Sequence, residues 1–120
     1  MGRKKRKPVE QELRVAPHLV LRTTEAHPEG VDRDSAVSIV VYNEPLLYEM
    51  PVMTLLPILH TGDGPWMVLT VDPRYLAWYA LRRKEGPTRY PSVLDALEDV
   101  RTIIQDAINA EEFSNLITYR

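Results

Sequence analysis

Three prolines recur at intervals of six residues through the most apolar part of the chain, at Pro45, Pro51 and Pro57. A proline inside an α-helix removes a backbone hydrogen bond and clashes with the preceding turn, so a regular helix over this segment is excluded. The surrounding residues are apolar and must nevertheless be buried. We therefore predict extended chain here, with a strand from about Val52 to His60.

Further strands are predicted on both sides of this segment. The stretch SAVSIVVYN at 35–43 is short, apolar and β-branched, which is typical of a strand. Residues 13–25 also favour extended chain, but Pro17 lacks the donor that a central strand needs, which predicts an edge strand or a broken strand. The sequence TGDG at 61–64 predicts a hairpin turn that leads into an apolar run at 65–71.

The stretch VDPRYLAWYALRRKEG at 71–86 admits two interpretations. Its aromatic residues favour a strand, of a kind that could stack nucleic-acid bases. Against this, Asp72 is a good N-cap and Pro73 suits the first helical position. Basic residues then fall where they would complement the negative end of a helix dipole, and Gly86 is placed for a left-handed C-cap. We predict a helix over 73–85.

A second helix is predicted from Val93 to Asn109. Ser92 is a good N-cap, and Asp95 three residues later resembles a capping box with aspartate in place of glutamate. Apolar residues recur at helical spacing along one face. Strands followed by helices predict an α+β fold, with a small antiparallel sheet of about four strands in the N-terminal two-thirds of the chain and a C-terminal helical hairpin packed on one face. We expect one such domain over 11–120, preceded by a disordered basic arm at 1–10.

The net charge of −2 is the sum of blocks of opposite sign. Residues 3–7, RKKRK, carry +5, and residues 74–90 carry +4. The intervening residues 8–73 carry −7, and residues 91–120 carry −4. This separation predicts surfaces of opposite potential on a nearly neutral protein.

The basic residues predict contact with nucleic-acid phosphates. The predicted contact residues are Arg3, Lys4, Lys5, Arg6 and Lys7 in the arm, and Arg82, Arg83, Lys84 and Arg89 in the second cluster. Two other interpretations of the arm stay open, namely a nuclear localisation signal and a solubilising tail. The second cluster is equally explained by helix-end electrostatics. Four acidic residues against Arg101 alone make the second helix a poor reader of the major groove, so any nucleic-acid contact is expected to be nonspecific.

A protein partner is predicted from two further groups of residues. Asp95, Glu98 and Asp99 would present an acidic surface to a basic partner. Tyr48 and Met50 lie in the proline-broken apolar segment, and methionine adapts well to irregular interfaces. The alternative for these two residues is a place in the core of the sheet.

Catalytic equipment is not evident in the sequence. The chain has no cysteine, and its five glycines form no phosphate-binding motif. His60 and Asp63 could contribute to a metal site, and His27, Glu29, Asp32 and Asp34 form a polar loop, but neither group has the spacing of a known ligand set. We expect a protein that is not an enzyme and that binds no metal or cofactor.

Two functions are compatible with these patterns. The first is a small binding protein, a regulator or adaptor of a nucleic-acid or nucleoprotein machine, with the arm on phosphates and the acidic body on a protein partner. The second is a structural or inhibitory interaction module without nucleic-acid contact, such as a viral component or an inhibitor of a host enzyme like the transcription machinery. No apolar run is long enough to span a membrane. An intracellular location is expected, cytoplasmic or, in a eukaryotic host, nuclear, and self-association stays open.

Overall fold

The computed structural model describes residues 11–26, 36–59 and 64–110. In these ranges six strands and two helices occur in the order β1 (Glu12–Ala16), β2 (Leu19–Glu25), β3 (Val37–Asn43), β4 (Tyr48–Pro57), β5 (Trp66–Val71), α1 (Pro73–Ala80), β6 (Arg89–Tyr90) and α2 (Val93–Asn109). The strands form one sheet in the order β1-β2-β3-β4-β5-β6, and every pair is antiparallel. Each strand therefore lies beside the next strand in the sequence.

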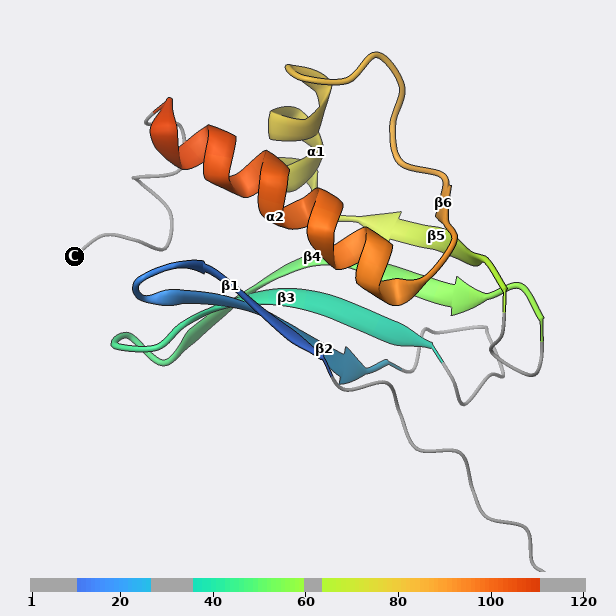
Figure 1. The fold of residues 1–120 in the computed structure, drawn as a ribbon, viewed down its shortest axis with the longest axis horizontal. Coiled ribbons are helices and arrows are strands. Elements are labelled where there is room, and N and C mark those ends of the chain that lie inside the picture. Colours follow the sequence, from blue (N-terminus) through green and yellow to red (C-terminus); the bar gives the residue numbers. More distant parts are fainter. Residues whose placement is uncertain (1–10, 27–35, 60–63, 111–120) are drawn as a thin grey trace, which may run out of the picture.

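Both helices lie on the same side of the sheet, which curls around α2 (Figure 1). The side chain of Gln105 on α2 donates a hydrogen bond to the backbone carbonyl oxygen of Val15 on β1 at 3.1 Å. This bond satisfies an acceptor on the outer edge of the sheet, where no further strand pairs. The predicted α+β architecture is confirmed, but the prediction of about four strands is wrong, because the described residues contain six. The helices also do not follow one another directly as the predicted hairpin, because β6 lies between them in the sequence.

The additional strands have two causes. Residues 13–25, predicted as an edge strand or a broken strand, form the hairpin of β1 and β2, with β1 at the edge of the sheet. Pro17 lies in the turn, where its missing donor costs nothing. The other cause is β6, which has only two residues and so shows no periodicity in the sequence.

The proline-rich segment forms the β3–β4 hairpin. Pro45 lies in its turn, whereas Pro51 lies inside β4. On one side of β4, β5 pairs only with Met53–Pro57, so it does not pair with Pro51. On the other side, where β3 pairs with β4, a register shift lies next to Pro51. Its missing donor is tolerated there. The predicted strand from Val52 to His60 thus starts earlier, at Tyr48, and ends at Pro57, while His60 lies outside the described residues.

Helix α1 has the predicted start but ends five residues before the predicted end at 85. Asp72 accepts a hydrogen bond from the backbone N–H of Arg74 at 2.9 Å, and Pro73 opens the helix. At the other end, Arg82 Nη1 donates to the carbonyl oxygen of Trp78 at 2.8 Å, while the Arg82 N–H turns to the carbonyl of Tyr79 at 2.9 Å. The Arg82 side chain thus occupies the Trp78 carbonyl, which the backbone N–H of Arg82 would bind if the helix continued. The helix ends at this point, and Gly86 does not act as its C-cap.

Helix α2 spans the predicted residues and supplies much of the core. Ser92 Oγ accepts a hydrogen bond from the backbone N–H of Asp95 at 3.1 Å, as the capping pattern predicts. The buried side chains of the helix pack against the inner face of the sheet. They are Val93, Ala96, Leu97, Val100, Ile103, Ile104 and Ala107.

The outer face of the sheet carries its own polar covering. The guanidinium of Arg22 lies 4.1 Å from the centroid of the Tyr42 ring, and Ser38 and Thr54 share a hydrogen bond of 3.1 Å across β3 and β4. Val20 and Val40 on this face are buried. Because a cation already occupies the Tyr42 ring, this face offers no free aromatic platform around that residue.

Candidate protein-interaction surface

The predicted basic cluster at the end of α1 is largely neutralised by the fold. The side chain of Arg82 is only 15% exposed, because it donates to the Trp78 carbonyl and lies 3.9 Å from a carboxylate oxygen of Asp106. Arg83 donates to Asp99 at 2.5 Å and its guanidinium lies 5.6 Å from the ring centroid of Tyr79. Both arginines therefore hold α1 against α2 rather than facing a ligand.

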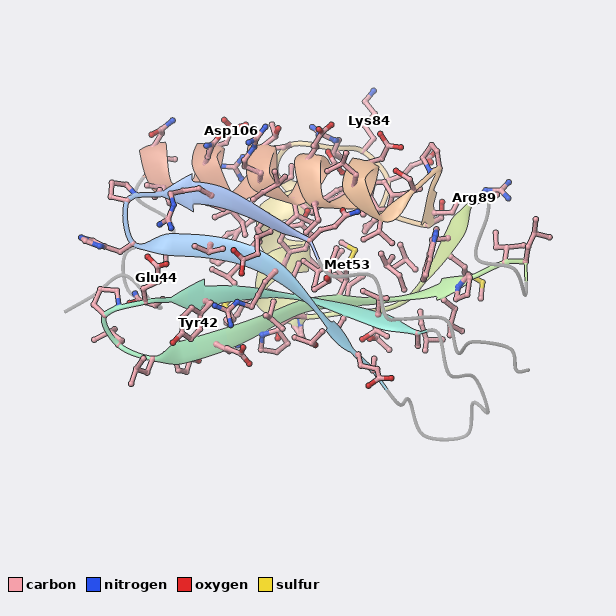
Figure 2. All side chains as sticks on the ribbon, turned by 60° about the horizontal axis from the view of Figure 1, so that its bottom comes forward. Tyr42, Glu44, Met53, Lys84, Arg89 and Asp106 are labelled. Atoms are coloured by element: carbon pink, nitrogen blue, oxygen red, sulfur yellow. The ribbon has the colours of Figure 1, made fainter. Side chains whose placement is uncertain are left out.

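Lys84 and Arg89 are exposed, as is Arg83, but Arg83 is paired with Asp99. In Figure 2 the side chains of Lys84 and Arg89 extend away from the body of the protein. Arg89 lies on β6 and Lys84 in the loop after α1. Of the four cations in this second cluster, Lys84 and Arg89 thus extend into solvent. The arm with Arg3, Lys4, Lys5, Arg6 and Lys7 lies outside the described residues.

The aromatic residues of α1 are not available for stacking. Tyr75, Trp78 and Tyr79 are between 0% and 7% exposed and belong to the hydrophobic core. At this spacing in a helix the three residues lie on one side, and in α1 that side is buried. Their role is therefore packing in the core. Base stacking on this segment is excluded in this fold.

The predicted acidic surface on α2 consists of two exposed carboxylates. Asp95 and Glu98 are exposed in the first turns of the helix. Asp99 is not free, because its two carboxylate oxygens accept hydrogen bonds from Arg83 and from the Tyr90 hydroxyl, the latter at 2.7 Å. Asp95 also accepts a hydrogen bond from the Ser92 hydroxyl at 2.8 Å. Glu98 is therefore the least engaged acid of the predicted three.

The two apolar residues predicted for partner binding separate in the structure. Met50 is 0% exposed and packs in the core, so it cannot touch a partner in this fold. Tyr48 is 41% exposed at the start of β4. Its side chain is a hydrogen-bond partner of Arg74 at the start of α1, whereas Asp95 lies in the first turn of α2. The structure does not bring the acidic and the apolar groups together.

Tyr48 belongs to an unusual turn between β3 and β4. Leu46, Leu47 and Tyr48 follow one another in the sequence, and their exposed fractions are 48%, 76% and 41%. Pro45 is at the second position of a four-residue turn, and the N–H of Leu47 donates to the carbonyl of Glu44 at 3.4 Å. We call residues 44–48 the hairpin tip.

The hairpin tip is braced from both sides. Asn43 is 3% exposed, and its side-chain oxygen accepts a hydrogen bond from the N–H of Leu46 at 3.0 Å. Arg14 on β1 makes two hydrogen bonds to the Glu44 carboxylate, at 3.0 and 3.2 Å, and a third to the Pro17 carbonyl at 2.9 Å. The Glu44 N–H donates to the carbonyl of His18 at 3.1 Å. The β1–β2 turn and the hairpin tip therefore form one unit.

The electrostatic state of this brace is well defined. The hydrogen bond from Arg14 holds the pKa of Glu44 below its usual value, and the same bond raises the pKa of Arg14. Each group thus favours the charged form of the other. Together the two charges cancel, which leaves the neighbouring leucines in a locally neutral environment. Figure 2 shows Glu44 at the end of the sheet where the two hairpin turns meet.

Leu47 adopts a backbone conformation that does not suit leucine. Its φ angle is 52°, in the left-handed region where glycine or asparagine is the usual residue. The strain costs on the order of 1 kcal/mol, and a side chain that is 76% exposed repays little of it by burial. The side chain of Leu47 therefore adds little to the stability of the isolated chain.

A shallow apolar hollow of about 300 Å³ lies beside the hairpin tip. It is bounded by the two hairpin turns and by the last turn of α2, and its lining includes Leu19, Pro45, Leu46 and Ile108. His18 and Asn43 add polar groups at its wall. A protruding leucine and an apolar hollow thus adjoin each other, an arrangement typical of a protein-interaction surface.

Within residues 11–26, 36–59 and 64–110, no three histidine or acidic side chains cluster as metal ligands would. The proposed pair of His60 and Asp63, and the loop with His27, Glu29, Asp32 and Asp34, lie outside these ranges. Neither α1 nor α2 is long and apolar enough to cross a membrane.

Comparisons with known proteins add no assignment. No protein family, curated protein or solved structure matches the chain. The functional argument therefore depends on the physical features described above.

The sequence analysis named Tyr48 but missed Leu46 and Leu47. A signal for them was present, because the sequence NEPLL combines an asparagine that can accept from the backbone with a proline suited to a turn. Two leucines inside such a turn cannot both reach the core. Apolar residues at a predicted turn would have indicated the hairpin tip.

Proposed function

We propose that this chain is a small non-enzymatic binding protein, a regulator or adaptor of a nucleic-acid or nucleoprotein machine. Its folded part docks on a protein through the hairpin tip, and its basic arm contacts phosphates. The observation that carries the proposal is the exposed, left-handed Leu47 on a turn fixed by Arg14, Asn43 and Glu44. A rigid apolar projection loses little conformational entropy when it binds, which suits an interaction anchor.

Nucleic-acid contact in this proposal is assigned to the arm. Residues 3–7 carry +5, whereas Arg82 and Arg83 are engaged within the fold. Lys84 and Arg89 are exposed and would add to a phosphate-binding surface. Contacts of this kind recognise the backbone of a nucleic acid and not its bases, so binding would be independent of sequence.

The arm is tested by removing residues 1–8 and measuring binding to DNA and RNA over a range of salt concentrations. Five phosphate contacts predict that the log–log salt dependence of the full chain is steeper than that of the truncated chain by up to about four units. Equal affinity and equal salt dependence of the two proteins would contradict the role of the arm.

The hairpin tip is tested with a matched pair of substitutions, Leu47→Asp and Leu81→Asp. Both leucines are highly exposed, 76% and 71%, but Leu81 lies at the end of α1, away from the tip. Proteins captured by the full chain from its native cell should be lost with Leu47→Asp and kept with Leu81→Asp. Equal capture by both variants would refute docking through the tip.

A second candidate function is an interaction module with no nucleic-acid contact, such as an inhibitor of another protein. It is favoured by one observation, namely that Arg82 and Arg83 are paired within the fold. Both functions use the hairpin tip for docking on a protein, but only the first assigns nucleic-acid contact to the basic arm. The arm deletion above therefore decides between them.

A further inference from the structure

The hairpin tip combines a projection and a recess on one surface. Leu47 extends from the turn, and the hollow of about 300 Å³ lies between the same turn and the end of α2. From this juxtaposition we propose that the partner at the hairpin tip is a second copy of this chain, so that the protein forms a two-fold symmetric dimer. The inference rests on the proposed docking function of the tip and names its occupant.

Self-complementary shape is the first argument. A two-fold interface uses the same patch on both subunits, so the patch must contain both the projecting and the receiving part. Here Leu47 of each copy would enter the hollow of the other copy, against Pro45, Leu46 and Ile108. A partner of different shape would need only one of the two features.

Charge is the second argument. A two-fold contact places like charges near each other, so a patch with a net charge repels its own copy. At the hairpin tip the charges of Arg14 and Glu44 cancel in a bidentate pair. Glu49 is paired in register with Tyr42 and so lies on the opposite face of the sheet from the hollow. The exposed acids of α2, Asp95 and Glu98, would by contrast oppose self-association through that helix.

Pre-organisation is the third argument. The turn is held by the Asn43 and Arg14 contacts, so little conformational freedom is lost on association. The contact is small, however, since stable interfaces bury about 1,200–2,000 Å² in total and a turn with its hollow offers less. We therefore expect a reversible dimer with a dissociation constant in the micromolar range.

Dimerisation would have a consequence for the arm. Two chains joined at their hairpin tips carry two copies of the RKKRK sequence. When one arm is bound, the second acts at a raised effective concentration, so the dimer would bind a long nucleic acid more tightly than the monomer does. Affinity for nucleic acid would then depend on protein concentration.

The test is sedimentation equilibrium of the purified full chain over a range of micromolar concentrations. The mass of the unmodified protein should rise from monomer to dimer with concentration. Leu47→Asp should weaken dimerisation by about tenfold or more, since it brings two carboxylates into an apolar contact. Leu81→Asp, the matched control, should leave the dissociation constant unchanged.

A second variant separates docking from folding. Leu47→Gly removes the projecting side chain and suits the left-handed backbone, so it should lose the dimer while its denaturation midpoint is equal or higher. A dimer that persists in both Leu47 variants overturns the inference.

A protein that stays monomeric at all concentrations also overturns the inference, and capture from the native cell then separates the two proposals. If a different protein is still captured in a Leu47-dependent manner, the proposed docking function stands without the dimer. If no such capture occurs, the docking function fails as well.

Discussion

Arg83 donates a hydrogen bond to Asp99 at 2.5 Å, and this ion pair joins the chain just after α1 to the middle of α2. The second carboxylate oxygen of Asp99 accepts from the Tyr90 hydroxyl at 2.7 Å. Tyr75 packs close by, 5.9 Å from Tyr79 between ring centroids, and its buried hydroxyl has no hydrogen-bond partner among the described residues. The Tyr90 hydroxyl is thus hydrogen-bonded, whereas the nearby Tyr75 hydroxyl is buried without a partner among the described residues.

Removing the two hydroxyls should therefore have opposite effects on stability. Tyr90→Phe loses a hydrogen bond to a charged acceptor and should lower the free energy of unfolding by about 1 kcal/mol. Tyr75→Phe removes a buried, unpaired hydroxyl and should leave that free energy unchanged or raise it by up to about 1 kcal/mol. Urea denaturation of both variants provides the measurement. An equal loss of stability in both would show that Tyr75 has a partner.

The same tyrosines predict a loss of stability at alkaline pH. Burial raises the pKa of Tyr75, and burial together with the Asp99 hydrogen bond raises the pKa of Tyr90. In the unfolded chain both titrate near pH 10, so above that pH the unfolded state releases protons that the folded state retains. Stability from this source is fully present below about pH 10 and falls as the pH rises further, by about 1.4 kcal/mol per pH unit for each tyrosine.

Denaturation midpoints measured between pH 8 and 12 would show this decline. The double variant of Tyr75→Phe and Tyr90→Phe should have a shallower decline than the unmodified chain, because two of the titrating groups are gone. Identical slopes would mean that the two hydroxyls ionise equally well in the folded protein.

Arg83 and Lys84 are adjacent basic residues with different predicted roles. Arg83→Ala removes the ion pair with Asp99 and should lower the free energy of unfolding by about 1 kcal/mol, since the pair is only partly exposed. Lys84→Ala should change it by less than about 0.5 kcal/mol. If the exposed cations contact phosphates, Lys84→Ala and Arg89→Ala should each flatten the salt dependence of nucleic-acid binding by about one unit.

Denaturation and binding isotherms on the same preparations distinguish these roles. A Lys84→Ala protein that is as destabilised as Arg83→Ala would contradict the division of the cluster into structural and exposed members.

Helix α2 and strand β3 were predictable because their signals are local. In α2 the cap, the apolar period and the length agree, and in β3 a short β-branched run has no competing helical pattern. The end of α1 was not predictable, because the Arg82 side chain competes with the backbone for the Trp78 carbonyl. The basic residues at 82–84 favour a helix C-terminus by their charge. The geometry shows that Arg82 binds a carbonyl in the last turn of α1, whereas Arg83 binds Asp99 on α2.

The candidate site was likewise only partly predictable from local sequence patterns. Tyr48 was singled out from its sequence context and is exposed, whereas Met50, two residues further along β4, faces the core. Side chains at i and i+2 of a strand lie on the same face, so Tyr48 and Met50 share one. They are not equally buried, because the cover over that face ends at the hairpin tip. The proposed role of Leu47 depends on its φ angle and on the pairing of Glu44 with Arg14, which are 30 residues apart in the sequence.

The sequence alone determined the class of the fold, the N-caps of both helices and the segregation of charge along the chain, because propensity, periodicity and proline sterics act between near neighbours. Tertiary structure decided the number of strands, the end of α1, which cations are neutralised and which leucines stay exposed. Those outcomes depend on contacts between residues far apart in the sequence, since Glu44 pairs with Arg14 and Asp99 with Arg83 only in the folded chain.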